Sequence, residues 1–292
     1  MSKKHPVGLG HAAVLCQMSA KDRLAFLAEG LPLILASAEG FQAGAEALRD
    51  RPREADVLEG FAAEEAAKVL ILIDMQRCPK AVRSQQTGTS IRWFYDHLAR
   101  LLYADAVKWK PSNKGELRSY IDRHRRSHGV DGPVGEYILP SGPVYDRERR
   151  LYADVERYDD GRPMWNAPRS WKEGLPATSI FNWPPAALRL AQAMQRLGMF
   201  TEGGLAAVAD IWGGETLTDA MTPHEAIALS EQMLRAIEAK GLIGEDATED
   251  DMRMIYHDWP FPMWDFDLSL VSVPLEELEE ERDRNFWSEA GY

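Results

Sequence analysis

A short basic stretch, residues 118–132, holds the residues whose types and spacing could do chemistry. It reads RSYIDRHRRSHGVDG and contains four arginines and two histidines. A histidine can accept or donate a proton near neutral pH, and an arginine can hold a phosphate and neutralise developing charge. Arg123 is followed by the polar His124 and, four residues later, by His128. By residue type, Arg123 and His128 are the candidates for catalysis, and the candidates for contacts to phosphate groups are Arg118, His124, Arg125 and Arg126.

Two other interpretations of this stretch remain open. A run of like charges is often only the solvated face of a helix. His124 and His128 are also four residues apart, which is the spacing of two metal ligands on one helix, and Asp131 follows closely. No convincing further ligand lies nearby in the sequence, so we expect neither a bound metal nor a cofactor.

A second set of candidates lies in the segment FAAEEAAKVLILIDM, which is otherwise almost wholly apolar. Glu64 and Lys68 are four residues apart and could form a surface ion pair on one helix face. If the segment is instead packed in a helical bundle, its polar groups need partners, and His97 or Arg100 could supply them. The competing interpretation of His97 is an ordinary core histidine.

Three segments follow one another in an order that resembles the AbiV family of abortive-infection proteins. They read AAEEAAK, FYDHLAR and RERRLYADVERYDDGRPMWNAP, and the resemblance covers roughly residues 20–170. The matching positions are Glu65, Lys68, Asp96, His97, Leu151 to Asp154, Gly161, Trp165 and Pro168.

The AbiV family is related to the HEPN group, and this resemblance implies the fold and the function that we expect. HEPN proteins are all-helical, often form homodimers and frequently cut RNA, and RHRRSH fits their hallmark Arg–polar–His pattern. The expected activity is a toxin-like, metal-independent endoribonuclease triggered by a phage protein, attacking through the ribose 2′-hydroxyl. His97 and His128 then compete as the catalytic base. The residues expected to support the site are Glu64, Glu65, Lys68, Asp96 and Arg100.

Two further functions remain as alternatives. The chain could be a non-catalytic helical interaction module that senses or sequesters a phage or host protein. It could also be a metal-dependent hydrolase built on His124, His128 and nearby carboxylates.

The elements that must position these residues are mainly helices. Apolar residues at three- and four-residue spacing predict helices over 19–49, 52–77, 89–109 and 113–128, with a kink or break at Pro32. Alternation around Leu151 to Val155 and the DDG turn predict a small β-hairpin near 143–166. Helices resume over 185–199, 202–214, 222–243 and 248–259.

The predicted fold class is therefore mainly α: a HEPN-like helical bundle with a small inserted β-hairpin and a helical C-terminal extension. We expect a helical domain over 17–172, a helical lobe over 173–274 and an acidic segment over 275–292. The aromatic segment IYHDWPFPMWDFD, residues 255–267, is either a strap that closes the core or an exposed groove for a partner.

Composition limits the class of protein. The 292 residues carry a net charge of -12, which opposes general nucleic-acid binding and leaves room only for a local basic cleft. Two isolated cysteines suit a reducing compartment. The longest apolar runs are shorter than the roughly 20 residues of a membrane span, so we expect a soluble, cytoplasmic protein with no membrane partner.

Overall fold

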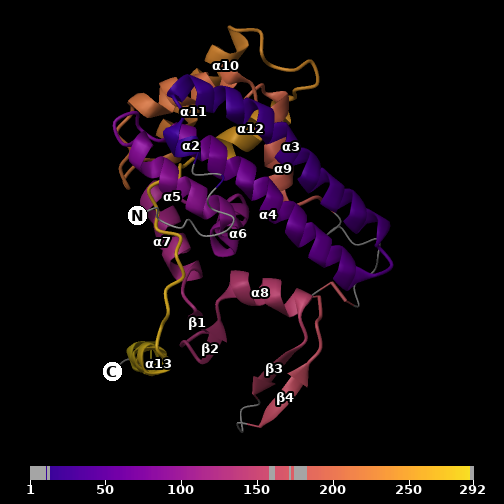
Figure 1. Cartoon of the computed structure of the whole chain (residues 1–292). Helices are drawn as coiled ribbons and strands as arrows, with labels where there is room; N and C mark the ends of the chain where they lie inside the picture. Colours follow the sequence, from indigo (N-terminus) through magenta and orange to yellow (C-terminus); the bar gives the residue numbers. More distant parts are fainter. Residues whose placement is uncertain (1–10, 12–13, 158–161, 171, 174–182, 290–292) are drawn as a thin grey trace, which may run out of the picture.

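The protein is mainly helical, with two small antiparallel hairpins, as a computed structural model shows (Figure 1). The structure describes residues 11, 14–157, 162–170, 172–173 and 183–289. The helices are α2 (Val14–Gln17), α3 (Ala20–Ala47), α4 (Pro52–Arg77), α5 (Arg83–Tyr95), α6 (His97–Ala106), α7 (Lys114–His124), α8 (Gly142–Leu151), α9 (Ala186–Arg196), α10 (Glu202–Ile211), the 3₁₀ turn η1 (Trp212–Gly214), α11 (Pro223–Glu238), α12 (Glu249–His257) and α13 (Leu275–Glu289). The predicted fold class, mainly α with a small hairpin and a helical C-terminal part, is confirmed.

Helices α3 and α4 form the long antiparallel pair on which the rest of the molecule is built (Figure 1). Ser19 caps α3 by accepting a hydrogen bond from the backbone N–H of Asp22 at 3.1 Å. Pro32 does not end this helix, which runs unbroken to Ala47. α4 is the central element, because nearly every side chain from Ala62 to Arg77 faces another part of the protein.

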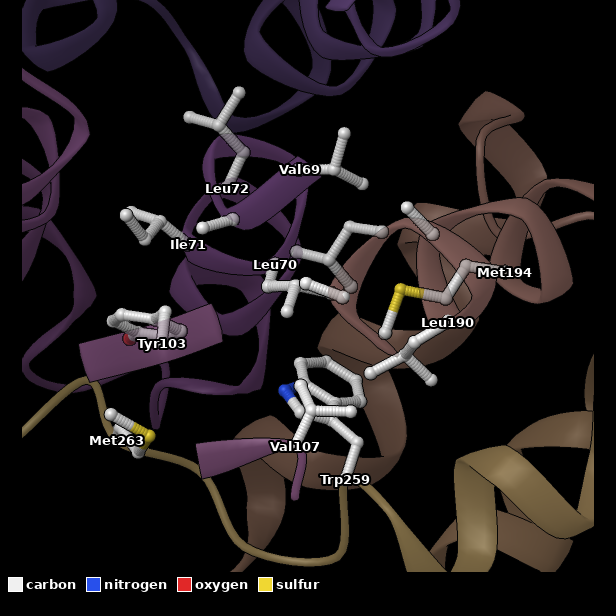
Figure 2. Packing of buried hydrophobic residues seen from close by; sticks show 14 of the residues in the cluster. Val69, Leu70, Ile71, Leu72, Tyr103, Val107, Leu190, Met194, Trp259 and Met263 are labelled. Carbon is white, nitrogen blue, oxygen red and sulfur yellow. The ribbon is translucent and has the colours of Figure 1, made fainter. Parts of the chain in front are cut away.

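The core joins side chains from both sides of the predicted boundary at residue 172. α4 packs against α6 on one side and against α9 and α10 on the other. Figure 2 shows Leu70 of α4 facing Leu190 and Met194 of α9, with Trp259 closing the same space. One continuous cluster thus includes residues from Leu27 to Leu268. The division into separate lobes stays a prediction.

Two predicted helices have different boundaries in the structure. The single helix expected over 89–109 is wrong, because the chain breaks at Asp96 into α5 and α6. The Asp96 carboxylate accepts a hydrogen bond from the backbone N–H of Ala99 at 2.9 Å, which starts α6 as an N-cap. The helix expected to reach His128 ends at His124, and His128 begins a strand instead.

Both hairpins extend from the same end of the helical body, on either side of α8 (Figure 1). β3 (Asp154–Arg157) pairs with β4 (Pro163–Asn166), which confirms the predicted hairpin, but residues 142–151 before it form α8 and not a strand. The predicted DDG turn lies outside the described residues. β1 (His128–Asp131) pairs with β2 (Tyr137–Pro140), and this second hairpin was not predicted.

The aromatic segment after α12 is a strap that closes the core, as predicted. Trp259, Phe261, Trp264 and Phe266 are all buried. The strap is also held by charge, because the fully buried Lys114 donates a hydrogen bond to the Asp265 carboxylate at 2.6 Å.

A buried polar cluster fastens this strap to α4. The Asp74 carboxylate accepts hydrogen bonds from the hydroxyl of Tyr103 at 2.9 Å and the backbone N–H of Met263 at 2.8 Å. Arg77 donates to the carbonyls of Trp259 at 3.4 Å and Pro260 at 2.5 Å. The strap therefore satisfies polar groups that α4 would otherwise bury without partners.

The last segments lie away from the helical body. Val271 pairs with the residues that follow α7, and α13 packs against β1 and β2. α13 is the acidic helix expected at the end of the sequence, and it buries Leu278.

Helix α3 is, by length and composition, apolar enough to cross a membrane, and it is the one such helix among the described residues. Core helices of soluble proteins pass the same test. The expected cytoplasmic location and the absence of a membrane partner stay predictions.

Candidate functional site

A cluster of one carboxylate, one imidazole and two guanidinium groups forms where α4, α6 and α8 meet. Glu64 lies at its centre, with only 4% of its side chain exposed. Its Oε2 is 2.7 Å from Nδ1 of His97 and 3.5 Å from Nη1 of Arg100. Its Oε1 accepts a hydrogen bond from Nε of Arg147 at 2.8 Å. We call Glu64, His97, Arg100 and Arg147 the Glu64 cluster.

The geometry fixes the tautomer of His97. Nδ1 lies 2.7 Å from Oε2 of Glu64 and 2.9 Å from Nη2 of Arg100. A ring nitrogen carries either one hydrogen or one lone pair, so it can form a hydrogen bond with only one of these two groups. An unprotonated nitrogen 2.7 Å from a carboxylate would be repelled, so Nδ1 carries the hydrogen and donates it to Glu64. Arg100 has other acceptors, the backbone carbonyls of Tyr95 and Asp96. Nε2 of His97 is therefore a hydrogen-bond acceptor, on a side chain that is 55% exposed.

The sequence predicted part of this cluster. Glu64, His97 and Arg100 do come together, as the need for partners inside an apolar helix suggested. Arg147 was missed, because it lies 83 residues from Glu64 and in a stretch that was expected to be a hairpin. The signal that could have found it is the RERR run, whose helical spacing directs Arg147 and Arg150 toward carboxylates of α4.

The other predicted supporting residues have local structural roles. Glu65 forms an ion pair with Lys68, whose ammonium lies 5.3 Å from the ring centre of Phe94. Asp96 caps α6 through the hydrogen bond described above. Neither contact reaches His97, so these residues shape the helices around the cluster without entering it.

In the basic stretch, three of the predicted phosphate-binding arginines are already paired with carboxylates. Arg118 binds Asp219 and Asp265, and Arg125 binds Asp122 and Asp267. Arg126 binds Glu281 of α13. Four of these five carboxylates come from the C-terminal half of the chain. These arginines therefore fasten that half to α7 and its continuation.

The predicted catalytic pair of this stretch is divided between two elements. Arg123 lies exposed on α7, whereas His128 lies exposed at the start of β1, where its Nδ1 is 3.4 Å from the hydroxyl of Ser127. His124 points elsewhere and packs against Trp109, with ring centres 4.6 Å apart. A catalytic role for Arg123, His128 or His97 stays a prediction. Among the described residues, no group of three or more His, Cys, Asp or Glu could hold a metal ion.

Comparison with known proteins gives one distant relative. The chain is 28% identical over 154 residues to a sugar fermentation stimulation protein homolog from Pseudomonas entomophila (strain L48). The match covers 52% of this chain and 65% of that protein, so the chain spans less than two thirds of the relative's length. No protein-family model and no solved structure matches the chain.

This finding corrects the family and the function expected from the sequence. The relative carries a different name, so the resemblance to AbiV and HEPN proteins is wrong, and with it the abortive-infection endoribonuclease activity. The structure gives a physical reason, because the RHRRSH hallmark is divided between a helix and a strand. An RNA partner, a phage trigger and homodimerisation are not tested by these findings and stay predictions.

Proposed function

We propose that the chain binds a small oxyanion-bearing metabolite, such as a sugar phosphate, at the Glu64 cluster. The observation that carries this proposal is the guanidinium group of Arg147, whose Nε is bound to the buried carboxylate of Glu64 while its Nη groups are left to donate to a ligand. Among the described residues, neither the Nη groups of Arg147 nor Nε2 of His97 has a hydrogen-bond partner.

The charge of the cluster favours an anion. Two guanidinium groups, Arg100 and Arg147, face one carboxylate, Glu64, which leaves an excess of positive charge. This local excess contrasts with the net charge of -12 over the whole chain. A guanidinium group can hold two oxygens of a phosphate or carboxylate side by side, and such charge-assisted hydrogen bonds are among the strongest in proteins.

Glu64 also holds the donors in place before a ligand arrives. Its two oxygens fix Arg147 through Nε and His97 through Nδ1, and this leaves the far ends of both side chains free to bind. Such preorganisation lowers the entropy that a ligand would lose by ordering them. The name of the distant relative refers to sugar fermentation, and it supports anionic intermediates of sugar breakdown as the first ligands to try.

Calorimetric titration at low ionic strength tests the proposal, with inorganic phosphate and glucose 6-phosphate as probes. We expect binding to the unchanged protein. Arg147→Gln should weaken it at least about tenfold, because one charge-assisted hydrogen bond contributes about 1.5–3 kcal/mol. His97→Ala should also weaken the binding of glucose 6-phosphate, because Nε2 of His97 can accept a hydrogen bond from a hydroxyl group of the ligand. The His97 side chain is 55% exposed, so its removal should leave the fold intact.

Arg253→Gln is the matched control, since this arginine on α12 is 73% exposed and, in the part of the chain that the structure describes, forms an ion pair with Asp250 alone. It should bind both probes as the unchanged protein does. Equal affinity in all four proteins would mean that the anion binds elsewhere, and no binding at all would overturn the proposal directly.

A further inference from the structure

A pocket of about 490 Å³ is lined in part by the α8 residues Gly142, Pro143, Asp146, Arg149 and Arg150. Its walls come from α4, α6, α8 and the start of α9, four elements that also contact one another in pairs (Figure 1). Trp109, His124 and Trp183 complete the lining. The volume lies within the range of roughly 300–1,000 Å³ that small-molecule sites occupy.

Each charged residue that lines this pocket is paired with an opposite charge. Asp105 binds Lys108 at 2.7 Å, and Asp146 lies 3.3 Å from Arg149. Asp56 lies 3.4 Å from Arg150, and Glu59 is paired with Lys172, which lies outside the lining. An ionic ligand would therefore have to compete with an ion pair that is already formed.

These pairs still leave hydrogen-bonding capacity in the pocket. A carboxylate has room for about four hydrogen bonds, whereas the ion pairs of Asp105 and Asp146 each engage one oxygen. A neutral ligand rich in hydroxyl groups can donate to these oxygens without disturbing the charge balance.

His124 adds an acceptor on the same wall. Its Nδ1 is 2.7 Å from the carbonyl oxygen of Tyr120, and because a carbonyl can only accept, Nδ1 must carry the hydrogen. In this tautomer Nε2 is a hydrogen-bond acceptor. The ring is held in this orientation by Trp109, which packs against both His124 and Tyr120.

The rest of the lining is apolar or aromatic. Ala63, Leu101 and Pro143 contribute aliphatic surface, and the indole of Trp109 offers a flat face with a polar N–H. A pyranose ring matches this mixture, because its C–H faces pack on apolar surface while its hydroxyl groups point to the sides.

We infer that this pocket binds a neutral, polyhydroxylated, sugar-like molecule. Its lining shares no residue with the Glu64 cluster, so the inference does not depend on the proposed oxyanion site. A zwitterion of similar size would also suit paired charges, but it would not use the aliphatic wall and the free acceptor of His124 together.

Saturation-transfer NMR and calorimetry with glucose and maltose test the inference on the full chain, with L-glutamine as the zwitterionic comparison. We expect a sugar signal that Trp109→Ala and Asp105→Asn each weaken at least tenfold. The matched controls are Trp165→Ala on β4, whose side chain is exposed, and Asp210→Asn on α10. Both controls should bind as the unchanged protein does.

Asp105→Asn keeps the test decisive even if Trp109→Ala unfolds the protein. No sugar signal, glutamine binding in place of sugar, or equal loss in variants and controls would each overturn the inference. Arg147→Gln should leave sugar binding unchanged, so failure of this pocket and failure of the oxyanion site can be told apart.

Discussion

Arg77 is a charged side chain with no exposed surface. Its guanidinium carbon lies 3.9 Å from the ring centre of Trp212 and 4.1 Å from that of Trp259, so it is stacked between two indoles. Burial lowers the pKa of Arg77 to about 10, although the nearby Asp74 carboxylate opposes this shift. The residue remains protonated at neutral pH, and its charge must therefore be satisfied inside the protein.

Removing the charge of Arg77 should be strongly destabilising. Arg77→Met leaves the Asp74 carboxylate buried without its cation, and we expect the free energy of unfolding in urea to fall by about 3–5 kcal/mol. The double variant Asp74→Asn/Arg77→Met removes both charges and should recover part of that loss. If the free energy of unfolding of the single variant fell by less than about 1 kcal/mol, the buried Asp74 carboxylate would not require the charge of Arg77 for its stability.

The two cysteines should differ sharply in reactivity. Burial raises the pKa of the Cys78 thiol to about 12, whereas Cys16 is exposed on α2. Because the thiolate is the reactive form, Cys78 should not react at pH 8 in the folded protein. A thiol titration should give one reactive group in the native state and two in urea, and Cys16→Ser should give none until the protein unfolds. Two reactive groups in the native protein would contradict this.

At the scale of elements, the approach of α10 to the end of α9 depends on a glycine. A Cβ built on Gly204 would lie 2.0 Å from the carbonyl oxygen of Gly198, far closer than van der Waals contact allows. Gly198 itself has a φ of 76°, in the left-handed region that ends many helices. The turn between α9 and α10 is therefore tight because two glycines permit it.

Substituting Gly204 should separate these helices. Gly204→Ala forces backbone to move and should lower the unfolding free energy by about 1–3 kcal/mol. The matched control is Gly40→Ala in α3, where a Cβ would meet nothing within 4 Å. That variant should raise stability by about 0.5–1 kcal/mol, because alanine favours a helix more than glycine does. Equal effects at both positions, measured by urea unfolding, would refute the close approach.

At the scale of the whole molecule, one core holds most elements, while the C-terminal helix lies apart from it. α13 packs against the small β1–β2 hairpin, and Arg126 binds Glu281 across this contact. Isolated two-stranded hairpins are only marginally stable in water. The element against which α13 packs therefore contributes little stability of its own.

This arrangement predicts two levels of local stability. Amide hydrogens of α13 and the β1–β2 hairpin should exchange with deuterium well before those of α4, which lies in the centre of the core. Breaking the Arg126–Glu281 ion pair with Glu281→Gln should speed exchange in α13 and leave α4 unchanged. Equal protection of α13 and α4 would show that the final helix is part of the main cooperative unit.

The sequence predicted the elements better than their ends or their partners. Apolar spacing indicated α3, α4 and α9 to α12, because these helices each bury one face or more. The break at Asp96 and the early end of α7 were missed. A polar residue that caps a helix also fits the apolar spacing of a longer, continuous helix, so the spacing does not show where one helix ends. Arg147 was missed for a different reason: its stretch was expected to be a hairpin, so the helical spacing of its RERR run was not used, and its contact with Glu64 also depends on how α8 docks.

The contacts of Arg77 with the aromatic strap also bear on how the chain acquires its structure during synthesis. Its acceptor on Trp259 is 182 residues further along the chain. At a translation rate of about 5–20 residues per second, a ribosome needs about 10–35 s to add that length. During this interval α4 is complete but its arginine has no strap to bind, so a nascent chain would hold an exposed apolar helix whose Arg77 has only Asp74 of the same helix as a partner. General chaperones recognise this kind of intermediate. The yield of folded protein should therefore depend on chaperones, whereas the stability of the protein, once folded, should not.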